Sequence, residues 1–131
     1  MILGVGTDLV NIERIRKVLD RFGDRFEERV FSKIEIQKSR GRYDPSSSYA
    51  KRWAAKEACS KALGTGLGRG VSWKEMHIVN LSSGKPELVV EGKAKDFLTA
   101  MTPRGYTSKI HVTLTDDFPW AKATVIIEGI S

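Results

Sequence analysis

The chain has 131 residues, of which 40% are hydrophobic and 29% are charged, and it carries a formal net charge of +6. A chain of this length is expected to form one domain, 1–131, with a modest core and no room for a second. Its N-terminus has neither a basic segment nor an apolar run of membrane-spanning length, so we expect a cytoplasmic protein. The single cysteine, Cys59, excludes a disulfide within the chain and is expected to pack in the core.

The positive charge is concentrated in one part of the chain. Residues 33–74 contain ten Lys or Arg and three Asp or Glu, a net charge of +7, whereas the rest contains twelve and thirteen, a net charge of −1. A local basic excess of this kind favours an anionic ligand, an acidic protein partner or nucleic acid. The alternative is a basic face that is simply solvated.

Residues 2–10 are predicted to form the first strand, with Gly4, Gly6 and Asp8 on one face. Glycine weakens a strand, so two glycines in alternation indicate that another backbone or a ligand approaches closely. The Asp8 carboxylate would then lie at the edge of that space. The alternative is that Asp8 only ends the strand and helps to start the next helix.

Asn11 is a candidate cap for a helix whose apolar residues recur at spacings of three and four, which predicts a stripe facing the core. The stripe consists of Ile12, Ile15, Leu19, Phe22 and Phe26. Arg14, Arg21 and Arg25 lie off the stripe among acidic residues, so they form either a mixed-sign solvated face or a surface for an acidic partner. Gly23 is expected to break or kink the helix.

A second helix start is predicted at Ser32, because Ser32 and Glu35 have the spacing of a capping box. Glu35 is therefore assigned a structural role before a catalytic one. Residues 41–48 form a predicted loop.

Residues 46–70 are predicted to form a long helix, capped by the serines at 46–48 and ended by Gly64, that runs into a glycine-rich loop. One face carries alanines and Cys59, and such small side chains suit a helix that is packed closely on a sheet. The opposite face carries Glu57, with Lys61 one turn later. The simplest alternative for these two residues is a surface ion pair worth a few tenths of a kcal/mol.

The remainder of the chain is predicted to form two hairpins separated by a short helix. The hairpins cover 75–92 and 109–129, and the helix covers 94–101. In the second hairpin Ile110 and Val112 face inward and His111 faces outward. The order predicts an α+β fold with a largely antiparallel sheet packed on a long central helix.

Asp8, Glu57, Lys61 and the glycine-rich loop together are typical of a site for Mg²⁺ and phosphate. Mg²⁺ takes one or two carboxylates and completes its coordination with water and phosphate oxygens. Lys61 supplies compact positive charge to a pyrophosphate, and loop N–H groups such as those of Gly64 and Gly66 can donate to phosphate oxygens. The loop follows a helix and lacks the ending of a P-loop, and neither a zinc cluster nor a nucleophile elbow is present.

Two segments of the chain resemble the signatures of the bacterial holo-acyl-carrier-protein synthases, which are small members of the 4′-phosphopantetheinyl transferase superfamily. The first signature is GVGTDLV at 4–10, and the second is WAAKEA at 53–58 followed by KALGTG at 61–66. The similarity extends to 84–86, 111–114 and 123–128, so it covers essentially the whole chain.

The resemblance implies that Asp8 and Glu57 bind Mg²⁺ and that coenzyme A is the donor in fatty acid biosynthesis. A serine of the apo acyl carrier protein would attack the β-phosphate, giving holo carrier protein and adenosine 3′,5′-bisphosphate. The general base stays open among Glu57, Glu35 acting through a water, and a metal-bound water.

The resemblance also implies a homotrimer with active sites between subunits, for which Arg52 and His111 are candidates on the opposite wall. Arg14, Arg21 and Arg25 would dock the acidic helix of the carrier protein. We expect no membrane or nucleic-acid partner. The alternative function is a non-catalytic module that binds RNA or another polyanion, although the basic residues lack the interleaved aromatic residues of a stacking platform.

Overall fold

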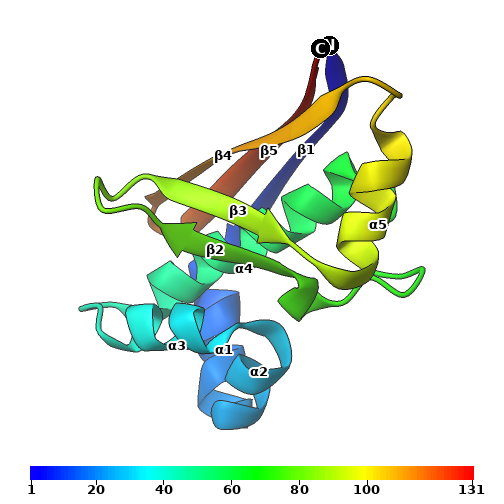
Figure 1. The fold of residues 1–131 in the computed structure, drawn as a ribbon. Coiled ribbons are helices and arrows are strands. Elements are labelled where there is room, and N and C mark those ends of the chain that lie inside the picture. Colours follow the sequence, from blue (N-terminus) through cyan, green and yellow to red (C-terminus); the bar gives the residue numbers. More distant parts are fainter.

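A three-stranded antiparallel sheet and a two-stranded hairpin lie on different sides of one long helix in the computed structural model, which describes all residues 1–131 (Figure 1). The strands are β1 (Ile2–Asn11), β2 (Met76–Asn80), β3 (Pro86–Val90), β4 (Thr107–Asp117) and β5 (Trp120–Ile130). The helices are α1 (Ile12–Phe22), α2 (Asp24–Val30), α3 (Lys33–Arg40), α4 (Pro45–Ala62) and α5 (Gly92–Met101), with a short 3₁₀ helix, η1 (Trp73–Glu75). The predicted α+β class, antiparallel pairing and central helix are confirmed.

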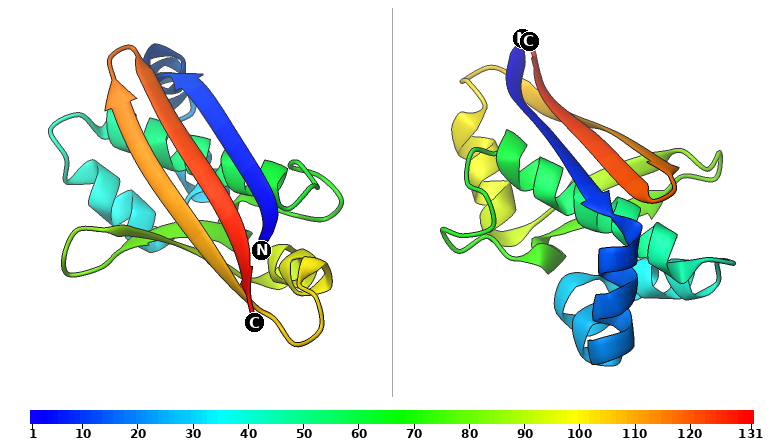
Figure 2. Two further views of the ribbon diagram at one scale, coloured as in Figure 1. Left: turned by 90° about the horizontal axis from the view of Figure 1, so that it is seen from above. Right: turned by 180° about the vertical axis from the view of Figure 1, so that it is seen from behind.

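The strands form two sheets instead of the single one we expected. Strand β5 lies between β1 and β4 and pairs antiparallel with both, whereas β2 pairs only with β3. Helix α4 packs against β1 and β5 on one side and contacts β2 on the other (Figure 1). The outer face of the three-stranded sheet has no helix over it (Figure 2).

Strand β1 lies directly on α4, as the alternating glycines predicted. A Cβ atom added to Gly4 would lie 2.1 Å from the Ala62 carbonyl oxygen, and one added to Gly6 would lie 1.9 Å from that of Ala58. Both distances are far below van der Waals contact, so only glycine allows this approach. Asp8 follows on the same strand, beside the same helix.

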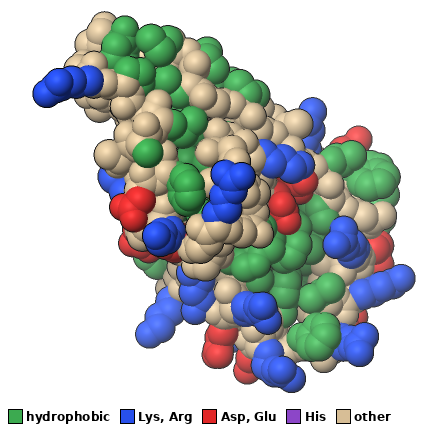
Figure 3. Space-filling view, turned by 90° about the vertical axis from the view of Figure 1, so that its right-hand side faces the viewer, with side chains coloured by type: hydrophobic (Ala, Val, Ile, Leu, Met, Phe, Trp, Pro, Cys, Tyr) green, Lys and Arg blue, Asp and Glu red, His purple; other side chains and the backbone are tan.

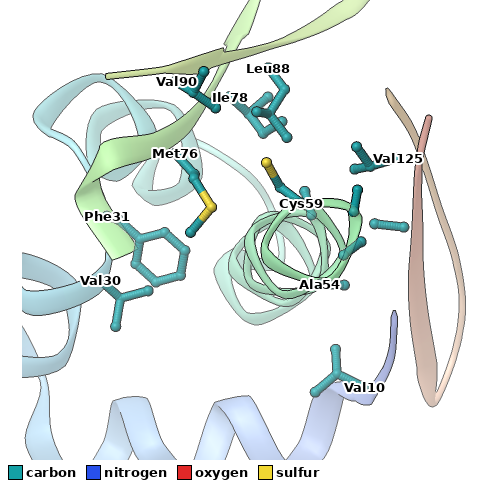
Figure 4. Close-up of a cluster of buried hydrophobic side chains, with 14 of the residues drawn as sticks. Val10, Val30, Phe31, Ala54, Cys59, Met76, Ile78, Leu88, Val90 and Val125 are labelled. Atoms are coloured by element: carbon teal, nitrogen blue, oxygen red, sulfur yellow. The ribbon is translucent and has the colours of Figure 1, made fainter. Parts of the chain in front are cut away.

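The small face of α4 forms the centre of the core. Ala54 and Cys59 are fully buried, and around them lie side chains from both sheets and from the helical layer, which consists of α1, α2 and α3 (Figure 4). The prediction that Cys59 packs in the core is confirmed, and burial raises the pKa of its thiol to about 12. Helix α4 is capped by Asp44, whose side chain accepts from the Ser46 N–H, and not by a serine as predicted. Pro45 fits the first turn, where its missing N–H costs nothing.

The predicted stripe of the first helix holds except at one residue. Ile12, Ile15 and Phe26 are buried, but Phe22 is 44% exposed. The chain turns at Gly23, with φ at 52°, so α2 starts in a new direction and Phe22 is left outside the core.

No helix of the structure has the length and apolar character needed to cross a membrane.

Candidate active site

Lys61 joins the central helix to the first strand. Its Nζ atom donates to Asp8 Oδ1 at 3.1 Å and to the Thr7 carbonyl oxygen at 3.0 Å. The Asp8 side chain is only 17% exposed, whereas that of Lys61 is 51% exposed. The structure therefore brings together these two predicted site residues, which are 53 positions apart in the chain.

Glu57 lies one turn before Lys61 on α4, yet the two side chains do not form the surface ion pair that their spacing permits. The Glu57 carboxylate has no hydrogen-bonding partner. Its pKa is raised, first because partial burial disfavours the charged form and second because the Asp8 carboxylate repels it. Lys61 and Arg14 oppose this shift, so two carboxylates and two cations share one site.

This set of groups fits a hard divalent cation. No cluster of three or more His, Cys, Asp or Glu residues is present, so a cation here would take its side-chain ligands from Asp8 and Glu57. Two carboxylates with water and phosphate oxygens are a usual set for Mg²⁺, and a cation would relieve the repulsion between them.

Glu35 is excluded as a general base because it is fully buried and both of its carboxylate oxygens are occupied. Oε1 accepts from Lys56 Nζ at 2.8 Å and from the Ser32 N–H at 2.9 Å, and Oε2 accepts from the Ile78 N–H at 3.0 Å. The capping box predicted from sequence is confirmed. Lys56 also donates to the carbonyl groups of Trp73 in η1 and Met76 in β2, so this buried pair connects α3, α4, η1 and β2.

The glycine-rich loop closes the C-terminus of α4. The N–H of Gly64 donates to the Lys61 carbonyl oxygen at 3.0 Å, and that of Gly66 donates to the Ser60 carbonyl oxygen at 3.1 Å. The expectation that these two N–H groups bind phosphate is therefore wrong, because the end of the helix already uses them. The N–H groups of residues 67–70 have no partner in the chain and are the loop's free donors.

Arg52 lies in the N-terminal half of α4, away from Asp8 and Lys61. It is 4% exposed, its Nη1 donates to Ser48 Oγ at 2.7 Å, and its Nε has no partner. It lines a cavity of about 300 Å³ with Arg42, Lys51 and other residues of 43–48. The loop predicted at 41–48 is shorter than expected, because α4 already begins at Pro45. Burial lowers the pKa of Arg52.

His111 lies on the outer face of the three-stranded sheet, as predicted, and its Nε2 is 2.9 Å from Glu128 Oε1. Neither Arg52 nor His111 hydrogen-bonds to Asp8, Glu57 or Lys61 within the chain.

An apolar cavity adjoins the arginines of the helical layer and was not predicted. It has a volume of about 440 Å³ and is flanked by Arg25 and Arg29. Its apolar lining comprises Val18, Phe22, Phe26, Val30, Trp53 and Trp73. Trp53 and Trp73 are stacked with ring centroids 4.2 Å apart. Figure 3 shows apolar side chains gathered on this face with mostly Lys and Arg around them.

Comparison with known proteins agrees with the geometry. The family described as the 4′-phosphopantetheinyl transferase superfamily matches residues 4–120. The holo-[acyl-carrier-protein] synthase of Roseobacter denitrificans is 62% identical over 99% of this chain and 97% of its own. That of a Ruegeria species is 63% identical over 98% of this chain and 91% of its own.

Solved structures give the same result. The holo-[acyl-carrier-protein] synthase of Neisseria meningitidis is similar with a TM-score of 0.84 and 32% identity, covering 98% of this chain and 99% of the other. The Helicobacter pylori enzyme in complex with coenzyme A is similar with a TM-score of 0.81 and 31% identity, covering 95% and 99%. These relatives are enzymes, so the alternative of a non-catalytic polyanion-binding module is set aside. The chain belongs to the holo-acyl-carrier-protein synthases of the 4′-phosphopantetheinyl transferase superfamily.

Proposed function

We propose that this protein transfers 4′-phosphopantetheine from coenzyme A to a serine of an apo acyl carrier protein in a reaction that depends on Mg²⁺. The observation that carries the proposal is the cluster of Asp8, Glu57 and Lys61, which two signature segments bring together where β1 lies on α4. The relatives act as holo-[acyl-carrier-protein] synthases by name, and one was solved with coenzyme A.

In the proposed reaction the serine Oγ forms a bond to the β-phosphorus of coenzyme A. The bond from that phosphorus to the bridging oxygen breaks, and adenosine 3′,5′-bisphosphate leaves with the oxygen. Asp8 and Glu57 would hold Mg²⁺, which when bound neutralises charge on the pyrophosphate. Glu57 is the carboxylate of this site that can accept the serine proton, directly or through a water, because its oxygens have no partner in the chain whereas Asp8 is paired with Lys61.

Coenzyme A has a further phosphate on its ribose, and the Arg52 cavity suits such a group. The guanidinium is buried, its Nε–H is unpaired, and Arg42 and Lys51 line the same space. Charge-assisted hydrogen bonds to phosphate are short and strong, and a buried unpaired donor is costly unless a ligand satisfies it.

The carrier protein would dock on the helical layer. An acidic helix bearing apolar side chains would match the apolar cavity and the arginines beside it. The positive charge of Arg14 interacts with the Glu57 carboxylate and opposes the rise in its pKa, so this docking surface borders the proposed catalytic cluster.

We further propose that the protein works as a homotrimer. The outer face of the three-stranded sheet exposes large apolar side chains, among them Val5, Leu9 and Trp120, which a second copy of the chain could cover. Sedimentation at the concentration of the assay tests this oligomeric state, and a fully active monomer would contradict it.

The proposed role is in fatty acid biosynthesis in the cytoplasm.

The test of the function is mass spectrometry of an apo carrier protein incubated with this protein, coenzyme A and Mg²⁺. We expect a gain of one phosphopantetheine on the wild-type carrier and none on a carrier whose acceptor serine is alanine. Chelation of Mg²⁺ with EDTA should stop the reaction, and added Mg²⁺ should restore it. No gain in mass with a folded enzyme and a competent carrier would refute the proposal.

A further inference from the structure

The Lys61 ammonium is bound by two oxygen atoms that would also suit a divalent cation. Its Nζ lies 3.1 Å from a carboxylate oxygen of Asp8 and 3.0 Å from the Thr7 carbonyl oxygen. Carboxylate and carbonyl oxygens are the protein ligands that hard cations prefer. The ammonium thus supplies the positive charge that balances the Asp8 carboxylate, whose side chain is 17% exposed.

Glu57 lacks such a partner. Its carboxylate accepts no hydrogen bond, although Asp8 and Lys61 both lie near enough to act on it electrostatically. A divalent cation held by both carboxylates would have to share Asp8 with the ammonium or displace it. Sharing is unfavourable because the two cations would repel each other at short range.

We infer that Lys61 is a resident counter-cation of the metal site, which Mg²⁺ has to displace from Asp8, and that the released ammonium then becomes available to the pyrophosphate of coenzyme A. The inference rests on the proposed function, because it takes the metal ligands and the donor substrate from it. The half-exposed side chain has room to swing out of contact with Asp8.

Lys61 would couple the binding of Mg²⁺ to the binding of coenzyme A, so that each ligand strengthens the binding of the other. Mg²⁺ would bind the free enzyme weakly because it has to break the ion pair between Lys61 and Asp8. Coenzyme A would offer the ammonium a new anionic partner and so reduce that cost, and by linkage Mg²⁺ would strengthen the binding of coenzyme A in the same proportion.

The test is isothermal titration of Mg²⁺ into the free enzyme without coenzyme A, at low ionic strength. Lys61→Met removes the charge and all donors while keeping the length of the side chain. An exposed ion pair and the residual repulsion between two cations predict that this variant binds Mg²⁺ roughly three- to tenfold more tightly than wild type. Lys61→Arg keeps the charge and should stay within about twofold of wild type.

A matched control removes the same charge elsewhere. Lys95 is exposed on α5 and forms no ion pair, so Lys95→Met reports the effect of net charge alone and should bind Mg²⁺ as wild type does. Circular dichroism verifies that each variant is folded. As a second readout, titrating each ligand in the presence of the other should show less mutual strengthening between Mg²⁺ and coenzyme A in Lys61→Met than in wild type or Lys95→Met, with the remainder due to direct contact between Mg²⁺ and phosphate oxygens.

The outcomes separate the inference from the proposed function. Affinity in Lys61→Met that is unchanged, weaker, or increased no more than in Lys95→Met overturns the role of Lys61, while the transfer reaction can still stand. Tighter binding in Lys61→Met, including binding that is measurable only in that variant, supports it. If Asp8→Asn binds Mg²⁺ as tightly as wild type, the metal assignment of the proposed function fails, and the inference fails with it.

Discussion

Gly6 is the residue at which a single methyl group should damage the site most. In Gly6→Ala the new Cβ would lie 1.9 Å from the Ala58 carbonyl oxygen, whereas ordinary contacts begin at 3.4 Å. Strand and helix would have to separate by about 1.5 Å, the difference between these two distances, or the chain would have to distort. The same separation would move Asp8, two residues later on β1, away from Glu57 and Lys61.

Two effects follow, and they are measured separately. Overpacking of a core contact costs about 1–3 kcal/mol of unfolding free energy, which urea titration measures. A displacement of about 1 Å at a catalytic constellation can cost on the order of 10²-fold in rate, so kcat/KM should fall by that factor at temperatures where the variant is still folded.

Gly41→Ala is the matched control for this prediction. Gly41 has a right-handed helical conformation, and its Cβ would meet only atoms at 3.6 Å. We expect its stability and rate to stay near those of wild type. Wild-type stability and kinetics in Gly6→Ala would refute the view that the contact between β1 and α4 sets the geometry of the site.

Three further predictions concern charges. Glu57→Gln should raise the melting temperature of the metal-free protein at pH 7, because the raised pKa of Glu57 means that its ionised form destabilises the fold. This gain in melting temperature should vanish below the ordinary pKa of glutamate, where the wild-type side chain is also neutral. A lower melting temperature at pH 7 would contradict the prediction. Arg14→Glu should raise the KM for carrier protein more than the KM for coenzyme A. The control is Arg104→Glu, a charge reversal on an exposed loop, which should change neither KM. Equal effects of Arg14→Glu on both KM values would argue against docking by α1. Lys56→Met should lower the unfolding free energy measured by urea titration by about 3–5 kcal/mol, because it leaves the Glu35 carboxylate buried without its cation. A loss below about 1 kcal/mol would show that this ion pair does not stabilise the core.

Contacts that depend on local pattern could be predicted from the sequence. The alternating glycines of β1 and the small face of α4 are complementary surfaces, and each is visible within one stretch of about ten residues. Their contact brings Asp8 to Lys61, 53 residues apart, so the core of the candidate site followed from two local patterns.

Features that depend on long-range partners could not be predicted. Lys56 precedes Glu57, and its sequence context indicates a surface cation. In the structure it lies inside the core, where its ammonium donates to Glu35 and to the carbonyl groups of Trp73 and Met76. None of these partners is adjacent to Lys56 in the sequence, and a buried lysine is exceptional without them.

Two other differences have local causes that the sequence leaves ambiguous. A glycine-rich segment after a helix can close the helix or bind phosphate, and at Gly64 and Gly66 the carbonyl groups at the end of α4 take the N–H groups first. At Gly23 a change of helix direction removes Phe22 from the core stripe and creates one wall of the apolar cavity. The angle of such a turn depends on tertiary packing and not on periodicity.

The central claim is that Asp8 and Glu57 form one metal site, and transfer rates of Asp8→Asn, Glu57→Gln and the double variant at several Mg²⁺ concentrations test it most directly. Each single variant should lose on the order of 10²-fold or more in kcat/KM, as other active sites do when one charge-stabilising group is removed. Because both carboxylates would act through one bound ion, the double variant should lose hardly more than the worse single variant. Losses that multiply in the double variant, or single variants with near wild-type rates at limiting Mg²⁺, would contradict the account.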